Sequence, residues 1–143
     1  MGIDQWVTSF IASAGFGILF NVPAKRLAHC GFVGMLGWML YVLCGQAGLN
    51  AIGASLAAAF AVAVSSQLLA KLYKMPVIGF SAAGIIPLVP GGTAYDAMRN
   101  VVENHYDTAL QLASEALLIS GAIALGLVFS EVLNPFARRR LKL

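Results

Sequence analysis

Long apolar segments alternate with short polar ones along the chain. Between Arg26 and Lys71 no residue carries a formal charge, a stretch too long for one membrane span that fits two helices joined by a turn at 46–50. The predicted membrane segments are roughly 5–22, 30–44, 51–70, 75–90 (broken) and 108–132, with a polar outer helix at roughly 93–106. We expect an all-α, polytopic integral membrane helix bundle with about five transmembrane segments, in which residues 1–143 form a single transmembrane domain.

The fourth apolar segment contains Pro87 and Pro90, followed directly by Gly91 and Gly92. Each proline removes a backbone donor, and the glycine pair relaxes the chain again. In lipid, the carbonyl groups freed in this way cost several kcal/mol each unless protein or water satisfies them. Broken helices of this kind hold the ligand sites of transporters, so this segment points to transport.

Composition excludes a water-soluble globular protein. Hydrophobic residues make up 59% of the chain and charged residues only 10%, against about 25% in an ordinary soluble domain. The first residues lack the positively charged start of a signal peptide, so we expect the first helix to be retained. A net charge of +3 could indicate nucleic acid, but the positions of the charges argue against such a partner.

All basic residues except Arg99 lie in three clusters, and the acidic residues lie elsewhere. The clusters are Lys25-Arg26, Lys71 with Lys74, and Arg138-Arg139-Arg140 with Lys142. Such segregation is the topology signal of a membrane protein. If the broken segment crosses the membrane, five passes place all three clusters in the cytoplasm and the N-terminus outside. If that segment is re-entrant, the last cluster falls on the outer side.

Small residues recur at helical spacing in the predicted spans, which allows helix backbones to approach closely in lipid. The stripes are Ser9-Ser13-Gly17-Asn21, Gly31-Gly34-Gly37, Gly53-Ala57-Ala61-Ser65 and Ala116-Ser120-Ala124. Packing within the chain accounts for some of them. Five short helices enclose little volume, however, so we also expect a homo-oligomer or a partner subunit.

A polar face of the outer helix is a candidate for transport chemistry. Asp96, Asn100, Glu103 and Asp107 are spaced by three or four residues, and Arg99 lies within reach of Asp96 and Glu103. As the wall of a substrate path, this face could bind a carboxylate through Arg99 and an ammonium group or a proton through an acid. As a solvated external helix, it would form only internal ion pairs of little energy. Both interpretations stay open.

Three further polar residues are candidates. Glu115 is an ionisable group in the last apolar segment, either functional or at the level of the outer headgroups. Asn21 either donates to freed carbonyl groups or a ligand, or caps the end of the first helix. Thr93-x-x-Asp96 resembles a capping box, so we expect the outer helix to start near Thr93.

Motifs for catalysis, metal binding or cofactor binding are missing from the sequence. Cys30 and Cys44 have neither a CxxC spacing nor a histidine cluster nearby, which argues against a zinc site or a disulfide framework. A Gly-x-Ser-x-Gly elbow, a P-loop and a His-Glu-x-x-His helix are absent as well. We therefore expect a protein that is not an enzyme and that uses no metal or cofactor.

Three motifs resemble those of the threonine/serine exporter (ThrE) family, in the same order and with similar spacing. They are Gly17-Ile18-Leu19-Phe20-Asn21-Val22-Pro23, Gly48-Leu49-Asn50 and Ile86-Pro87-x-x-Pro90-Gly91-x-x-Ala94-Tyr95. More closely, the chain resembles the small, YjjB-like subunit of that family, which is similar to the C-terminal half of its single-chain members. The resemblance implies a functional role for the four residues that match the third motif of the family: Pro87, Pro90, Gly91 and Tyr95.

The resemblance implies a bacterial inner-membrane exporter of threonine and serine or of dicarboxylates, since one split pair of subunits is associated with succinate export. It also implies a larger partner subunit that resembles the N-terminal half of the exporters. We expect alternating access, with backbone groups freed between Pro87 and Gly92 and the helix N-terminus near Thr93 holding a substrate carboxylate, and one acid coupling proton movement. The alternative is a non-transporting membrane subunit that stabilises a larger transporter.

Overall fold

The computed structural model describes residues 2–141, with side chains described up to Asn134. In this part of the chain every regular element is a helix, which confirms the expected all-α fold. The elements are α1 (Ile3–Leu19), η1 (Ala24–Arg26), α2 (Leu27–Gln46), α3 (Ala51–Tyr73), α4 (Val77–Ile85), η2 (Ile86–Leu88), α5 (Gly91–Val102) and α6 (Tyr106–Leu141). Arg138–Arg140 lie in the last turns of α6 without described side chains, and Lys142 lies outside the described residues.

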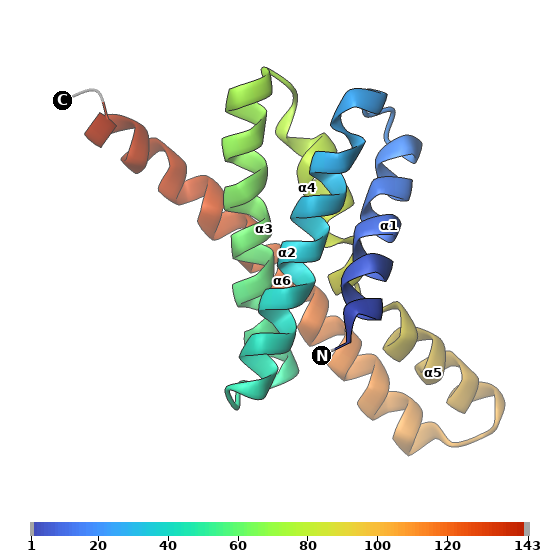
Figure 1. Ribbon diagram of the computed structural model, residues 1–143. Coiled ribbons are helices and arrows are strands. Elements are labelled where there is room, and N and C mark those ends of the chain that lie inside the picture. The colour runs from blue at the N-terminus through green and yellow to red at the C-terminus, as the bar shows by residue number, and fades with distance from the viewer. Residues whose placement is uncertain (1, 142–143) are drawn as a thin grey trace.

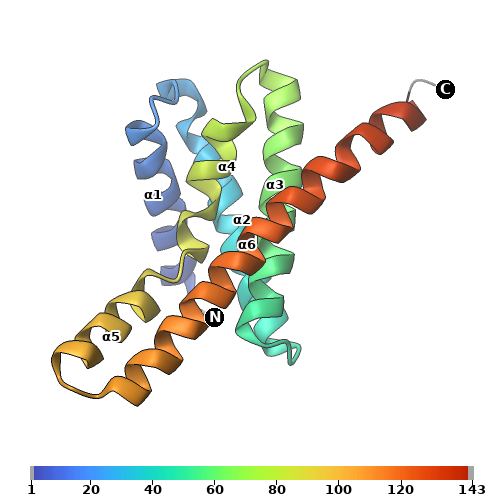
Figure 2. The ribbon, with the colours of Figure 1, turned by 180° about the vertical axis from the view of Figure 1, so that it is seen from behind.

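Helices α1 to α4 run side by side in alternating directions, and α5 and α6 form an arm that leaves this bundle (Figure 1). The short α4 ends near the middle of the bundle, where the chain turns outward into α5. From there α6 crosses back over the outer face of α3 (Figure 2). The arm is attached through α6, because α5 packs on α6 and α6 packs on α3.

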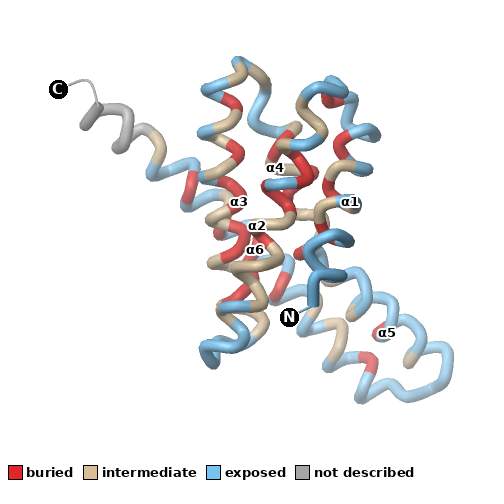
Figure 3. The backbone as a smooth tube through the Cα atoms, in the orientation of Figure 1, coloured by how far each residue is buried: buried red, intermediate tan, exposed pale blue. Residues whose placement is uncertain are grey.

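The core lies between α2, α3 and α4, and η2 and α6 add Leu88, Ile119 and Ile123 to it (Figure 3). Phe80 of α4 is the largest fully buried side chain. Gly84 lets α4 approach both neighbours, because a Cβ there would stand 2.6 Å from Val33 Cγ1 of α2 and 2.8 Å from Val62 Cγ1 of α3. Close packing at Gly84 therefore holds the short α4 against α2 and α3.

Among the described residues, three helices are long and apolar enough to cross a membrane: Ala24–Gln46, Ala51–Tyr73 and Tyr106–Asn134. A fourth crossing results if Val77–Leu88 and Gly91–Val102, which meet at 52°, form one broken span. Helix α1 has 17 residues, about 25 Å at 1.5 Å per residue, which is shorter than a membrane core of about 30 Å. A multi-pass membrane protein is confirmed, but the expected count of five crossings is not.

Small residues bring α1 and α2 together as expected. The buried members of these two stripes are Ser9, Ser13, Gly17, Gly31, Gly34 and Gly37. The stripes expected on α3 and α6 are not buried within the chain: Gly53, Ala57, Ala61 and Ser65 are half-buried, and Ser120 and Ala124 are exposed. On α3 the buried residues include Ala54, Ala58 and Val62 instead. Nearly every face of α3 is small and apolar, so spacing alone does not select the one that its neighbours cover.

The start of the outer helix differs from the expected one. Helix α5 begins at Gly91, and its N-cap is Pro90, which makes no side-chain hydrogen bond, so the expected capping box at Thr93 is wrong. Proline has no N–H to satisfy and its ring restricts φ to values that suit the entry to a helix. The helix therefore begins directly after Pro90, two residues earlier than the sequence indicated.

Candidate functional site

The break between α4 and α5 is a short link between two proline residues. Pro87 lies in η2, Val89 is extended, and Pro90 precedes α5. The Gly91 N–H donates to the Val89 carbonyl oxygen at 2.8 Å, and the Ala94 N–H donates to that of Pro90 at 3.0 Å. The N–H groups of Gly92 and Thr93 lie in the first turn of α5. Amide groups in the first turn of a helix have no acceptor within that helix.

A cavity of about 230 Å³ adjoins this link, and we call it the break hollow. Its lining residues are Trp38, Tyr41, Ser55, Pro87, Leu88, Val89, Pro90, Gly92, Thr93 and Ile119. Ser55 of α3 is 1% exposed, and its Oγ has no hydrogen-bond partner. Because a buried unsatisfied hydroxyl costs about 1–3 kcal/mol, a polar partner at Ser55 would be stabilising.

One side of the break hollow is aromatic. Trp38 and Tyr41 of α2 stack with ring centroids 5.3 Å apart. The Trp38 Nε1–H donates to Gln5 Oε1 of α1 at 3.3 Å, which ties the indole to the start of the first helix. The sequence interpretation did not include Ser55, Trp38 or Tyr41, because they become neighbours of the break only when α2 and α3 pack around it.

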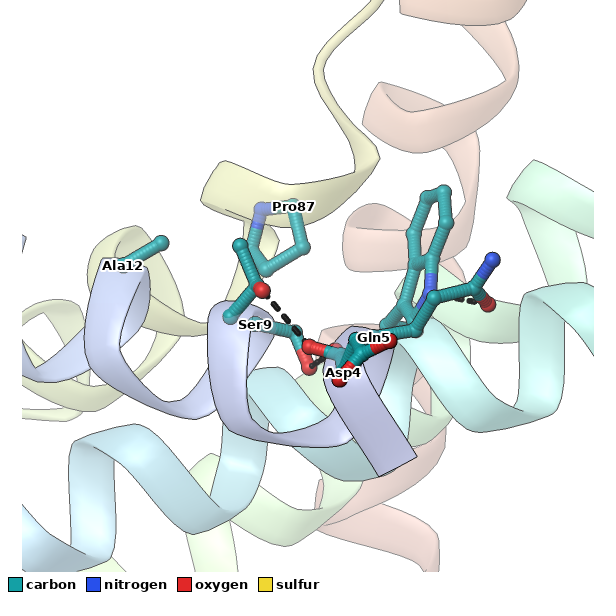
Figure 4. Close-up of a pocket in the computed structure, with 7 residues that line it drawn as sticks. Asp4, Gln5, Ser9, Ala12 and Pro87 are labelled. Carbon is teal, nitrogen blue, oxygen red and sulfur yellow. Dashed lines mark hydrogen bonds between the residues drawn. The ribbon is translucent and has the colours of Figure 1, made fainter. Parts of the chain in front are cut away.

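A second cavity of about 310 Å³, the α1 hollow, lies on the other side of Pro87 and Trp38. Figure 4 shows Asp4, Gln5 and Ser9 of α1 on one side of it and Pro87 opposite. The Ser9 hydroxyl donates to the Gln5 carbonyl oxygen at 2.7 Å, whereas the structure gives the Asp4 carboxylate no ion pair within the described residues. An unpaired carboxylate beside the break could accept an ammonium group.

A third cavity of about 470 Å³, the arm hollow, lies between α5 and α6. Pro90, Gly91 and Ala97 line it from the side of α5, and Ala113 and Ser120 from the side of α6. Its lining is almost entirely apolar. The predicted residues Pro87, Pro90, Gly91, Gly92 and Thr93 thus all border at least one of the three hollows.

The polar face of α5 lies away from the hollows. Arg99 Nε donates to Glu103 Oε1 at 3.0 Å, and the two side chains are 62% and 43% exposed. Asn100 Nδ2 donates to the Asp96 carbonyl oxygen at 2.8 Å, and Asp96 itself is exposed. None of these residues lines a hollow within the described part of the chain, so their role in transport stays a prediction.

The other predicted residues are separate from the break. Asn21 has a left-handed φ of 57° directly after α1, and the following Val22 N–H donates back to the Gly17 carbonyl oxygen at 3.0 Å. This is the geometry of a helix C-terminal cap, the second of the two roles considered for Asn21. Tyr95 is 68% exposed, and Glu115 is exposed on α6.

The chemistry available at the break is hydrogen bonding to an anion. No charged side chain lines the break hollow, and its described lining includes Ser55 and, from the first turn of α5, Gly92 and Thr93. A carboxylate accepts such bonds and is favoured at a helix N-terminus by the helix dipole. Among the described residues, no group of histidine, cysteine, aspartate and glutamate side chains could hold a metal ion.

Sequence comparisons with known proteins identify the family of the chain. A family model described as threonine/serine exporter, ThrE, matches residues 5–133. An uncharacterized protein of Haemophilus influenzae is 31% identical over 131 residues, which cover 86% of this chain and 44% of that relative. The chain therefore spans less than half the length of this relative, and no solved structure matches. Since the family model covers nearly the whole chain, the protein belongs to the threonine/serine exporter (ThrE) family.

Proposed function

We propose that this chain is a subunit of a secondary exporter that moves threonine and serine, or small dicarboxylates such as succinate, out of the cell. The family assignment supports export in general. The observation that carries the finer proposal is the buried, unpartnered Ser55 hydroxyl in a hollow that also borders the first turn of α5. All of the proposed substrates carry a carboxylate.

The break hollow suits a carboxylate for three reasons. The Ser55 hydroxyl and the amides of Gly92 and Thr93 are donors that need an acceptor. The α5 dipole favours negative charge at this helix end. A bound carboxylate that accepted from Ser55 would also remove the cost of about 1–3 kcal/mol that a buried unpaired hydroxyl carries.

The α1 hollow extends this proposal to amino acids. It shares Trp38 and Pro87 with the break hollow, and it offers the Asp4 carboxylate to an ammonium group. The second carboxylate of a dicarboxylate would be repelled by this negative charge. The two hollows together therefore favour threonine and serine over succinate.

The arrangement of charges supports the proposed topology in the bacterial inner membrane, with the N-terminus outside and the C-terminus in the cytoplasm. The segments that carry the three basic clusters, η1 and the ends of α3 and α6, lie at one end of the bundle (Figure 1). The N-terminus and the α5–α6 connection, with Asp4, Glu103 and Asp107, lie at the other end. Basic segments favour the cytoplasmic side.

We further propose that one of the acids at the outer end carries the proton that drives export.

A partner completes the transporter in this proposal, either a larger subunit that resembles the N-terminal half of the family or a second copy of the chain. Within the described residues the arm packs on the bundle mainly through α6 and α3, and many of its other side chains are exposed. Leu110, Leu117 and Leu118 of α6 are 70%, 74% and 56% exposed. In a membrane, lipid or a partner helix would cover such side chains. A partner would also enclose the polar face of α5 and turn it into a wall of the substrate path.

An export assay tests this proposal. Release of labelled threonine, serine and succinate is measured from cells that lack the chain and from cells complemented with the wild-type protein or the Ser55→Ala variant. The proposal requires the wild-type protein to restore export and the variant to restore much less at equal membrane abundance. In the alternative, a non-transporting subunit, Ser55→Ala would restore export fully, and deletion of the chain would reduce the abundance of a larger membrane partner.

A further inference from the structure

A fourth cavity, remote from the break, lies where α3 ends against the start of α4 and the later turns of α6. It has a volume of about 540 Å³, and we call it the basic hollow. Its polar lining consists of Gln67 and Lys71 of α3, Lys74 of the following turn, and Asn134 of α6. It shares no lining residue with the hollows around the break.

The basic hollow concentrates positive charge that no acid among the described side chains neutralises. Lys71 Nζ donates to Asn134 Oδ1 at 3.1 Å, which links α3 to α6. Neither Lys71 nor Lys74 forms an ion pair with an acid in the described part of the chain, and no acidic side chain lines the hollow. Glu131, one turn before Asn134, is exposed and outside the lining. Two ammonium groups on one cavity form an anion site unless an acid pairs with them.

The neighbouring contacts hold this end of α3 in place. Arg26 lies over the Tyr73 ring, with its guanidinium carbon 3.7 Å from the ring centroid. The Tyr73 hydroxyl is 2.8 Å from His29 Nε2 of α2. Lys74 has a left-handed φ of 52° and ends α3. The tyrosine contacts and this turn fix where α3 stops, so the two lysines need no large rearrangement to face a common ligand.

We propose that the basic hollow binds a phosphate group, that of an anionic phospholipid headgroup at the membrane surface. Lysine ammonium groups bind phosphate as point charges. Because Asn134 Oδ1 already accepts from Lys71, its Nδ2 group remains available to donate, as does the Gln67 amide. The C-terminal dipole of α3 opposes an anion by less than the two lysines attract it. The ligand's position at a helix end matches the headgroup region of a bilayer.

The experiment uses the purified full-length protein, delipidated and placed in uncharged detergent. Binding of fluorescent phosphatidylglycerol is compared with that of fluorescent phosphatidylcholine, for the wild-type protein and the single variants Lys74→Gln, Lys71→Gln and Lys25→Gln. Lys25 is a matched control, because it is an exposed lysine at the same end of the bundle and does not line the hollow. We expect the wild-type protein to prefer phosphatidylglycerol, and Lys74→Gln to weaken its binding about fivefold.

Lys71→Gln also removes the hydrogen bond to Asn134, so thermal unfolding shows whether that variant stays folded. Lys74 forms no such bond in the structure. The Lys74→Gln variant therefore tests the site whether or not Lys71→Gln stays folded. Competition by millimolar inorganic phosphate would assign the site to a soluble phosphate, whereas retained phosphatidylglycerol binding would assign it to lipid. The proposal is overturned if the wild-type protein binds both lipids equally, or if Lys25→Gln weakens binding as much as Lys74→Gln does.

Discussion

Gly34 of α2 makes room for Ser13 of α1: a Cβ on Gly34 would overlap Ser13 Oγ and stand 2.5 Å from Ser13 Cβ. The same Cβ would be 3.6 Å from Cγ of Pro87, so α1, α2 and the break meet at this point. The Ser13 side chain is fully buried, and its hydroxyl has no partner. The packing of the first two helices is therefore coupled to the position of the break.

Gly34→Ala should destabilise the protein by about 1–3 kcal/mol, because the added methyl group forces α1 and α2 apart. Gly45→Ala is the matched control on the same helix, since a Cβ at Gly45 meets nothing within 4 Å. The control should be neutral or slightly stabilising, as alanine favours helix over glycine. Thermal unfolding in detergent, monitored by circular dichroism, measures both. Equal unfolding midpoints for Gly34→Ala and Gly45→Ala would contradict the prediction that Gly34 is needed for the close contact with Ser13.

Gly126→Ala should loosen the arm from the bundle. A Cβ at Gly126 of α6 would stand 2.8 Å from the Leu56 carbonyl oxygen and 3.0 Å from the Phe60 nitrogen, both backbone atoms of α3 that cannot move aside. We expect a loss of about 1–3 kcal/mol and faster protease cleavage in the α5–α6 connection. Gly121→Ala, on the same helix with nothing within 4 Å of a Cβ, should behave like the wild type. Resistance of Gly126→Ala to protease would contradict this prediction.

Ser55→Ala should lower export while leaving the protein as stable as before or more stable, since it removes a buried hydroxyl that has no hydrogen-bond partner within the protein. Ser130→Ala is the control: Ser130 is also buried with an unpartnered hydroxyl but lines none of the hollows. Labelled threonine release and thermal unfolding are measured for both variants. A similar decrease in export for both would mean that the effect is structural and unrelated to the substrate.

Arg99→Ala and Asp96→Asn test the polar face of α5. The Arg99–Glu103 pair is largely exposed, so its loss should change the free energy of unfolding by less than about 1 kcal/mol. Any change in export then reports on the substrate path. We expect both variants to export less at matched membrane abundance, and Glu131→Gln, an exposed acid on the other side of the bundle, to export normally. Normal export by both test variants would remove this face from the mechanism.

The break and its prolines could be predicted from the sequence because they interrupt an otherwise continuous apolar segment. The outer face of α5 could be predicted too, since its polar residues recur at helical spacing. Ser55 could not, because α3 is small and apolar on nearly every side and only its neighbours determine which stripe is buried. One face of α1 also carries Asp4, Gln5, Thr8 and Ser9. Their helical spacing is visible in the sequence, but it does not show that this face lies beside the break.

The central claim is that the break between α4 and α5 holds the substrate. It is tested most directly by the Gly92→Cys variant in a background with Cys30 and Cys44 replaced by alanine, labelled in membranes with a water-soluble maleimide. A Cβ at Gly92 meets nothing within 4 Å, so the variant should fold, and Gly45→Cys provides a control at an equally open glycine. We predict that threonine or serine slows labelling of Gly92→Cys and not of Gly45→Cys. Labelling of Gly92→Cys at the same rate with and without threonine, serine and succinate would contradict the account.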